Sequence, residues 1–211
     1  MNFLDAVLVG RLTVAAGIMA AVQISLLILM FAVATNPFGP MSDVAYAITP
    51  VLMLPLLFAF RQVHRAEFPG GSQWVLVLGI LGIAVASINQ IIFLLKVIDL
   101  KQSMFGYSAG IGLIGLAILL FSLFNRTLPE ISGGFSIFSI VLGAAMTLGL
   151  VLGVFFLDEV YAMANGTLRF SPMTPITFLI GLSGAVNQLG LPVWLFILGR
   201  MFLAGKINIP A

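Results

Sequence analysis

With 61% hydrophobic and only 8% charged residues, this chain of 211 residues cannot cover a water-soluble surface, for which roughly 25% charged residues are typical. The composition excludes a water-soluble domain and predicts an integral membrane protein. The net charge of +2 comes from scattered basic residues, and the chain has no cysteine and one histidine, so we expect no nucleic-acid partner, no metal and no other cofactor.

Six long apolar runs separated by short polar segments dominate the sequence. A helix needs about 20 residues to cross a bilayer, and only helices or closed barrels satisfy their backbone in lipid. The runs are continuous rather than alternating in polarity, which indicates helices. We therefore predict an all-α, polytopic transmembrane helix bundle, a single domain over residues 1–211, with spans at about 12–34, 44–60, 74–97, 107–124, 135–157 and 175–199.

The first run, 12–34, resembles a signal peptide because "FAVATN" offers small residues at Ala32 and Ala34. The run is longer than the roughly 7–15 apolar residues of a signal peptide, which favours a retained span. Gln23 lies near its middle, where an amide costs free energy unless it finds a partner.

The second run, "ITPVLMLPLLFAF", contains Pro50 and Pro55. Each proline lacks a backbone donor and clashes with the preceding helical turn. We predict a kinked or partly broken helix, which serves either packing or, less commonly, a hinge.

The third run contains an amide pair, Asn89 and Gln90, deep in apolar sequence. Residues three or four positions apart share a helix face. This spacing puts on one face Gly79, Gly82, Ala86, Asn89, Phe93 and Lys96.

The fourth and fifth runs are rich in glycine. "GIGLIG", from Gly110 to Gly115, matches a dinucleotide-binding pattern in letters, but it lies inside a predicted membrane helix rather than after a strand. We interpret it as helix packing, because membrane helices associate where small residues allow close approach. The glycines that we expect at such contacts on the third to sixth runs are Gly79, Gly82, Gly112, Gly115, Gly149, Gly153, Gly181 and Gly184.

The sixth run repeats the amide pair as Asn187 and Gln188. Amides can form hydrogen bonds across a helix contact, each contributing about 0.6–2 kcal/mol. We therefore expect the two pairs to hold the third and sixth spans together, with Gln23 as a further contributor.

Alternatively, the amides line a polar pathway. The pair recurs in the third run of each three-run half, as in inverted repeats, whose binding sites lie near the midplane. No ionisable residue lies in the middle of a run, which argues against a proton-driven pump but not against a facilitator.

The basic residues predict the orientation, because cytoplasmic loops carry an excess of Lys and Arg. One side of the predicted bundle has Arg11, Arg61, Arg65, Arg126, Arg200 and Lys206, and the other has Lys96, Lys101 and Arg169. We predict both termini in the cytoplasm. His64 falls in a short loop on that side, and Asp158 with Glu159 ends the fifth span, so we expect all three side chains to be solvated.

The stretches "FGPMSDVAYAITPVLMLPLLFAFRQVHR" and "LGLPVWLFILGRMFLAG" are similar to small six-span bacterial membrane proteins of unknown function. The resemblance implies a bacterial inner-membrane protein and transfers no activity or catalytic residue.

Two functions follow from these patterns. The first is a non-catalytic membrane subunit or scaffold, since no catalytic motif, mid-membrane charge or soluble domain is present. Its partners are the lipid bilayer and either other membrane subunits or further copies of the chain. The alternative is a small-solute facilitator or channel whose polar site is formed by the Asn-Gln pairs.

Overall fold

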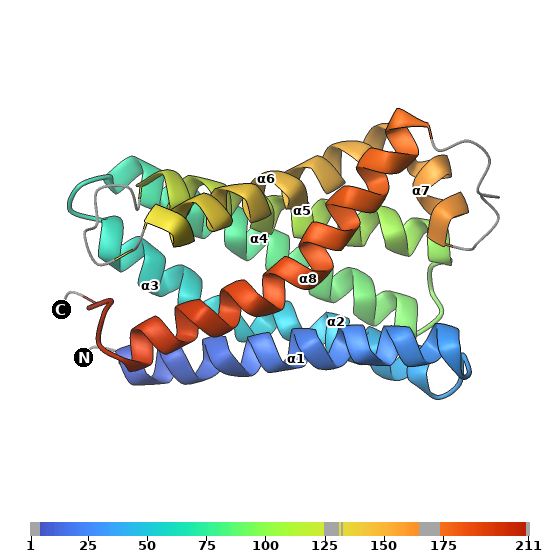
Figure 1. Ribbon diagram of the computed structural model, residues 1–211, viewed down its shortest axis with the longest axis horizontal. Coiled ribbons are helices and arrows are strands. Elements are labelled where there is room, and N and C mark those ends of the chain that lie inside the picture. Colours follow the sequence, from blue (N-terminus) through green and yellow to red (C-terminus); the bar gives the residue numbers. More distant parts are fainter. Residues whose placement is uncertain (1–4, 125–130, 132, 165–173, 210–211) are drawn as a thin grey trace.

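The computed structural model describes residues 5–124, 131, 133–164 and 174–209. This described part is entirely helical apart from its connections, which confirms the all-α prediction (Figure 1). Its helices are α1 (Ala6–Ala32), α2 (Phe38–Leu52), α3 (Leu54–His64), α4 (Pro69–Leu94), α5 (Leu100–Phe124), α6 (Gly133–Phe155), α7 (Leu157–Ala164) and α8 (Pro175–Leu203).

Six helical segments of the described chain are long and apolar enough to cross a membrane: α1, α2 together with α3, α4, α5, α6 and α8. Helix α1 begins earlier than its apolar run because Asp5 caps it, accepting a hydrogen bond from Val7 N at 3.0 Å. The short helix α7 lies where we expected a loop. Its first turn carries Asp158 and Glu159, and negative charge is favourable at a helix N-terminus.

The second span is divided, which confirms the predicted kinked or broken helix. Helix α2 ends at Leu52 and α3 begins at Leu54, with Met53 N donating to Pro50 O at 3.0 Å. Pro55 opens α3, where its missing N–H costs nothing.

Glycines bring neighbouring helices into backbone contact. A Cβ on Gly110 of α5 would lie 2.5 Å from Ala86 N of α4, and one on Gly143 of α6 would lie 2.9 Å from Gly115 O of α5. Five of the glycines that we expected at contacts also face a neighbouring helix closely: Gly79, Gly82, Gly112, Gly115 and Gly153.

Both chain termini lie at one end of the bundle, here called the terminal end, and α7 lies at the other, the α7 end (Figure 1). The half toward the terminal end has an aromatic core. The ring of Phe60 stacks on that of Phe121 with centroids 3.4 Å apart and meets Trp194 edge-on at 6.1 Å. His64 is buried in this core, 5.3 Å from the ring of Phe121, rather than solvated as expected. It is the last residue of α3, so it belongs to the packed helix and not to the loop.

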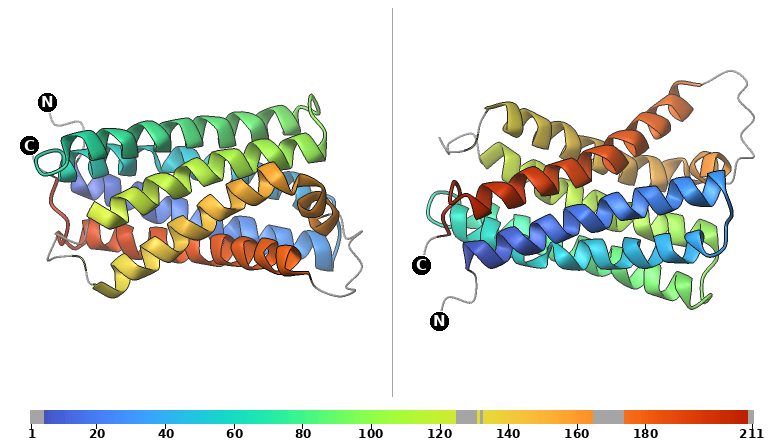
Figure 2. Two further views of the ribbon diagram at one scale, coloured as in Figure 1. Left: turned by 90° about the horizontal axis from the view of Figure 1, so that it is seen from above. Right: turned by 60° about the horizontal axis from the view of Figure 1, so that its bottom comes forward.

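Helix α8 changes its neighbour along its length. Toward the terminal end it packs closely on α1, where a Cβ on Gly199 would lie 2.9 Å from Gly10 O, and one on Gly17 would lie 3.1 Å from Pro192 O. The part of α8 that precedes Pro192 in the sequence diverges from α1 toward α6 (Figure 2). Ser183 Oγ secures this second half by donating to Ala145 O of α6 at 2.8 Å.

Candidate functional site

The amides of α4 connect this helix to its two neighbours. Asn89 Nδ2 donates to Ser103 O of α5 at 2.8 Å, and Gln90 Nε2 donates to Asp43 Oδ1 of α2 at 2.9 Å. Gly106 of α5 makes room for the Asn89 side chain, since a Cβ at this position would collide with Asn89 Oδ1. The amides of α4 are therefore hydrogen-bonded to α5 and α2.

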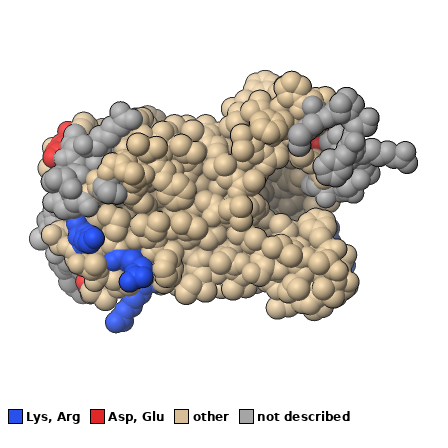
Figure 3. All heavy atoms as spheres, viewed as in Figure 1, with Lys and Arg blue, Asp and Glu red and all other residues tan. Residues whose placement is uncertain are grey.

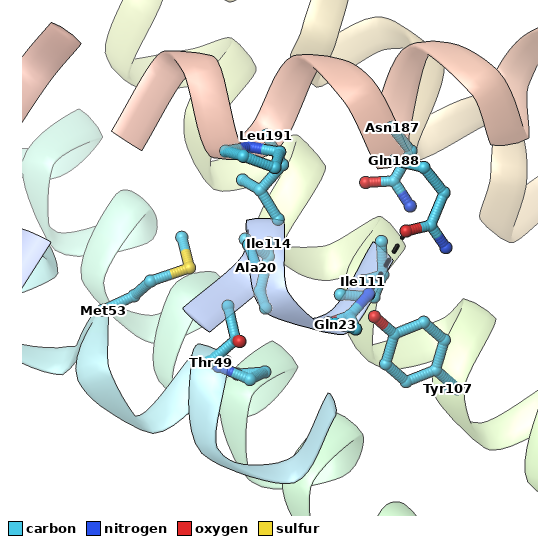
Figure 4. Close-up of a pocket in the computed structure, with 12 residues that line it drawn as sticks. Ala20, Gln23, Thr49, Met53, Tyr107, Ile111, Ile114, Asn187, Gln188 and Leu191 are labelled. Carbon is cyan, nitrogen blue, oxygen red and sulfur yellow. Dashed lines mark hydrogen bonds between the residues drawn. The ribbon is translucent and has the colours of Figure 1, made fainter. Parts of the chain in front are cut away.

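Gln188 of α8 belongs to a polar cluster with Gln23 of α1 and Tyr46 of α2. Gln188 Oε1 accepts from Gln23 Nε2 at 3.2 Å (dashed in Figure 4), and Gln188 Nε2 donates to Tyr46 Oη at 2.6 Å. Three helices therefore meet at one set of neutral hydrogen bonds.

These partners correct the expectation that the two amide pairs hold the third and sixth spans to each other. The pair on α4 bonds to α5 and α2, whereas Gln188 of α8 bonds to α1 and α2. Helical spacing identifies the residues that share a face, but it does not identify the neighbour which that face meets.

A cleft of about 140 Å³ opens beside α8, in the half of the bundle toward α7. It is visible as a hollow between the diverging ends of α8 and α1 (Figure 3). Residues of four helices line it: Tyr107, Ser108, Ile111, Met146, Gly149, Leu152, Val160, Ile180, Ser183, Gly184 and Asn187.

Small residues on α8 leave this cleft open instead of closing a helix contact. Gly184, which we expected at a close contact, has no atom within 4 Å of an added Cβ. Gly181 would meet only Met163 Cε at 3.4 Å. Gly149 of α6, in contrast, lies close to α8 as expected, since its Cβ would lie 3.3 Å from Ser183 Oγ. Since α8 has diverged from α1 here, no helix approaches Gly184 closely.

The floor of the cleft is a second, smaller cavity of about 10 Å³, about the volume that one water molecule needs. The cleft and the floor share three lining residues, Tyr107, Ile111 and Asn187, and therefore adjoin each other. Helix breakers border the floor on two sides, Pro50 on α2 and Pro192 on α8. The polar cluster contributes Gln23 and Gln188 to the same wall (Figure 4).

Three polar side chains in this lining remain available. Among the described residues, the Asn187 amide and the hydroxyls of Tyr107 and Ser108 have no hydrogen-bond partner, although the Tyr107 ring packs edge-on against Tyr46 at 4.7 Å. The described lining of both cavities contains no Lys, Arg, Asp, Glu or His. Such a site can bind a molecule by neutral hydrogen bonds and apolar contact.

Sequence reasoning identified Gln23, Asn187 and Gln188 as candidates but missed Tyr46 and Tyr107. The signal was present, since these are two of only three tyrosines and both lie within predicted spans. A buried tyrosine requires a partner for its hydroxyl, so it is as informative as a buried amide.

No family model matches this chain, and neither the curated proteins nor the solved structures include a significant match.

Proposed function

We propose that the chain is a small-solute facilitator, a multi-pass membrane protein that binds its solute in the cleft and passes it along the floor. The observation that carries this proposal is an open cleft that adjoins a neutral polar floor, which is bordered by two prolines within helices, Pro50 and Pro192. Membrane transporters commonly place their sites near the midplane beside interrupted helices.

The proposal requires the terminal half to open in a second conformation. In the structure that half is closed by fully buried side chains, including Phe60, Trp194 and Leu198. The break at Met53 and Pro192 of α8 both border the floor, so bending at these two points would move the terminal halves of α8 and the second span away from each other. The structure then corresponds to the state open toward α7.

Cysteine accessibility tests passage, because the chain has no native cysteine. Ala20 lines the floor and is small, so Ala20→Cys is a mild change. In oriented vesicles, silver ions, which react with thiols, do not cross lipid and are small enough for a cavity of this volume, should modify this cysteine from either side of the membrane. Ala16→Cys, one turn earlier on α1 and fully buried, is the matched control and should stay unmodified.

Modification of Ala20→Cys from one side alone would contradict passage. Modification from neither side would contradict a solute site altogether. Adding Gly184→Trp, which fills open space in the cleft, should block access from the α7 end only.

We further propose a bacterial cytoplasmic membrane with both termini inside the cell. The described basic residues support this, with Arg11, Arg61, Arg65, Arg200 and Lys206 toward the terminal end and Lys96 and Lys101 toward the α7 end; Arg126 and Arg169, also used for the prediction, lie outside the described residues. Both Val97→Cys and Ala66→Cys place a thiol at an exposed position. An impermeant maleimide should label the first and not the second in intact cells; the reverse would invert the orientation.

A second candidate is the non-catalytic membrane subunit or scaffold. It is favoured by the weak burial of α1, of which 22% of the span window is buried, against 50% for α4 and α5. Its exposed apolar side chains, such as Val22 and Ile28, could meet another subunit or a second copy, although lipid covers such a face equally well. Extraction in a mild detergent followed by native mass spectrometry tests this: a stoichiometric hetero-complex supports a subunit, and a monomer contradicts it.

A further inference from the structure

We infer that the molecule bound in the cleft is an uncharged amphiphile that enters sideways from the membrane, with a polar head of hydroxyl or carbonyl groups and an apolar tail. This inference rests on the proposed function, since it assigns a chemical class to the solute of the same cleft.

The direction of the opening favours a ligand dissolved in the membrane. Figure 3 views the molecule across its helices, and the hollow lies on that side, between the diverging halves of α1 and α8. If these helices span the bilayer, the opening faces lipid as well as the α7 end. A molecule that already lies in the bilayer can then enter without crossing the tightly packed half.

The available polar groups match a hydroxyl or carbonyl head. The Asn187 amide can donate and accept, and the Tyr107 hydroxyl can do both. Each lines both the cleft and its floor, so a head placed between them meets two hydrogen-bonding groups at once. In an apolar surrounding each group gains from such a partner, because an unpaired polar group is costly there.

The remaining lining residues limit the charge and the size of the head of the bound molecule. A charged head would be desolvated with no counter-charge among the described lining residues, which is unfavourable. The volume of about 140 Å³ accommodates on the order of ten water molecules, enough for a glycerol-sized head. Ile111, Leu152 and Ile180 supply apolar contact for the first carbons of a tail.

The experiment uses a monoacylglycerol with a photoreactive diazirine in its acyl chain, added to the full chain in phosphatidylcholine vesicles. After irradiation, mass spectrometry locates the adducts. We expect adducts on the cleft walls of α5, α6 and α8 that are reduced at least fivefold by unlabelled monooleoylglycerol. Oleate, which carries a charged head, and glycerol, which lacks a tail, should not compete at the same concentration.

Variants test the assigned contacts. Tyr107→Phe keeps the ring and removes the hydroxyl, so it should reduce competable labelling two- to threefold, and together with Asn187→Leu at least fivefold. Leu189→Val is the control, because Leu189 of α8 is 65% exposed and does not line the cleft. This variant should label as the unmodified chain does. Thermal unfolding of each variant verifies that it is folded, and unchanged labelling in folded Tyr107→Phe/Asn187→Leu would overturn the assigned contacts.

The competitors separate this inference from the proposed function. Equal competition by glycerol would overturn the amphiphile and leave a water-soluble solute, and equal competition by oleate would overturn the neutral head. Absence of competable labelling, with Ala20→Cys still modified from both sides, overturns the amphiphile alone. Absence of both signals overturns the inference and the proposed function together.

Discussion

The two halves of the bundle are built from the same apolar spans but differ in how the spans meet. In the half toward the terminal end, α8 contacts the backbone of α1 through glycine, and aromatic rings such as Phe60 and Trp194 fill the interior. In the half toward α7, α8 has diverged from α1, and its Gly184 faces open space. Polar groups gather where the two halves join.

The comparison shows that a glycine on a membrane helix has two opposite uses. Gly199 lets two backbones approach, whereas Gly184 leaves volume empty because no helix approaches it. The presence of a glycine does not by itself predict either use, and the course of α8 decides which one applies. Substitutions that exploit this difference can test the comparison.

The largest effect is expected for the aromatic core of the tight half. Trp194 is fully buried and its Nε1 donates to Ser139 Oγ at 2.7 Å, so Trp194→Ala should lower the free energy of unfolding by about 3–5 kcal/mol. Trp74→Ala is the control, because that ring is 62% exposed, and it should leave stability nearly unchanged. Denaturant titration in detergent micelles measures both; equal losses would contradict the burial of Trp194 in a packed core.

A smaller effect is expected at the glycines. Gly110→Ala forces a methyl group against Ala86 N and should cost about 1–3 kcal/mol through overpacking. Gly184→Ala places the same methyl group in open space and should be neutral or stabilise α8 slightly, since alanine favours helix. The same titration applies, and a comparable loss at Gly184 would mean that the cleft is closed in the membrane.

Substitutions of the adjacent amides Asn187 and Gln188 on α8 should also differ in their effect on stability. Gln188→Leu removes the bonds to Gln23 and Tyr46 and should cost about 0.6–2 kcal/mol. Asn187→Leu removes no hydrogen bond among the described residues, so its stability should hardly change while ligand labelling falls. Stability measured beside labelling separates packing from binding; a greater loss of stability at Asn187 would reverse the two assignments.

The smallest effect is expected at the ion pair of Lys101 and Asp158, which connects α5 to α7 at the open end. Both side chains are exposed, at 43% and 83%, where solvent and salt screen the attraction. Lys101→Met should leave the thermal midpoint unchanged at physiological salt. A clear drop would show that α7 is a necessary wall of the cleft.

The number of candidate spans, the helical class and the break in the second span could all be predicted from the sequence. Each of these follows from interactions within a few residues: hydropathy over one bilayer thickness for the spans, and the missing N–H groups of Pro50 and Pro55 for the break at Met53. Buried amides such as Gln23 could also be recognised as candidates, because a polar group in an apolar run needs a partner wherever the run packs.

The partners of these groups could not be predicted, because they depend on how the helices pack. Asn89 bonds to α5 and Gln188 to α1 and α2, and His64 enters the core, because helix neighbours are set by contacts between segments far apart in the chain. The cleft is a property of the whole bundle in the same way. It exists because α8 packs on α1 in one half and on α6 in the other, and no single run of residues encodes the space left between them.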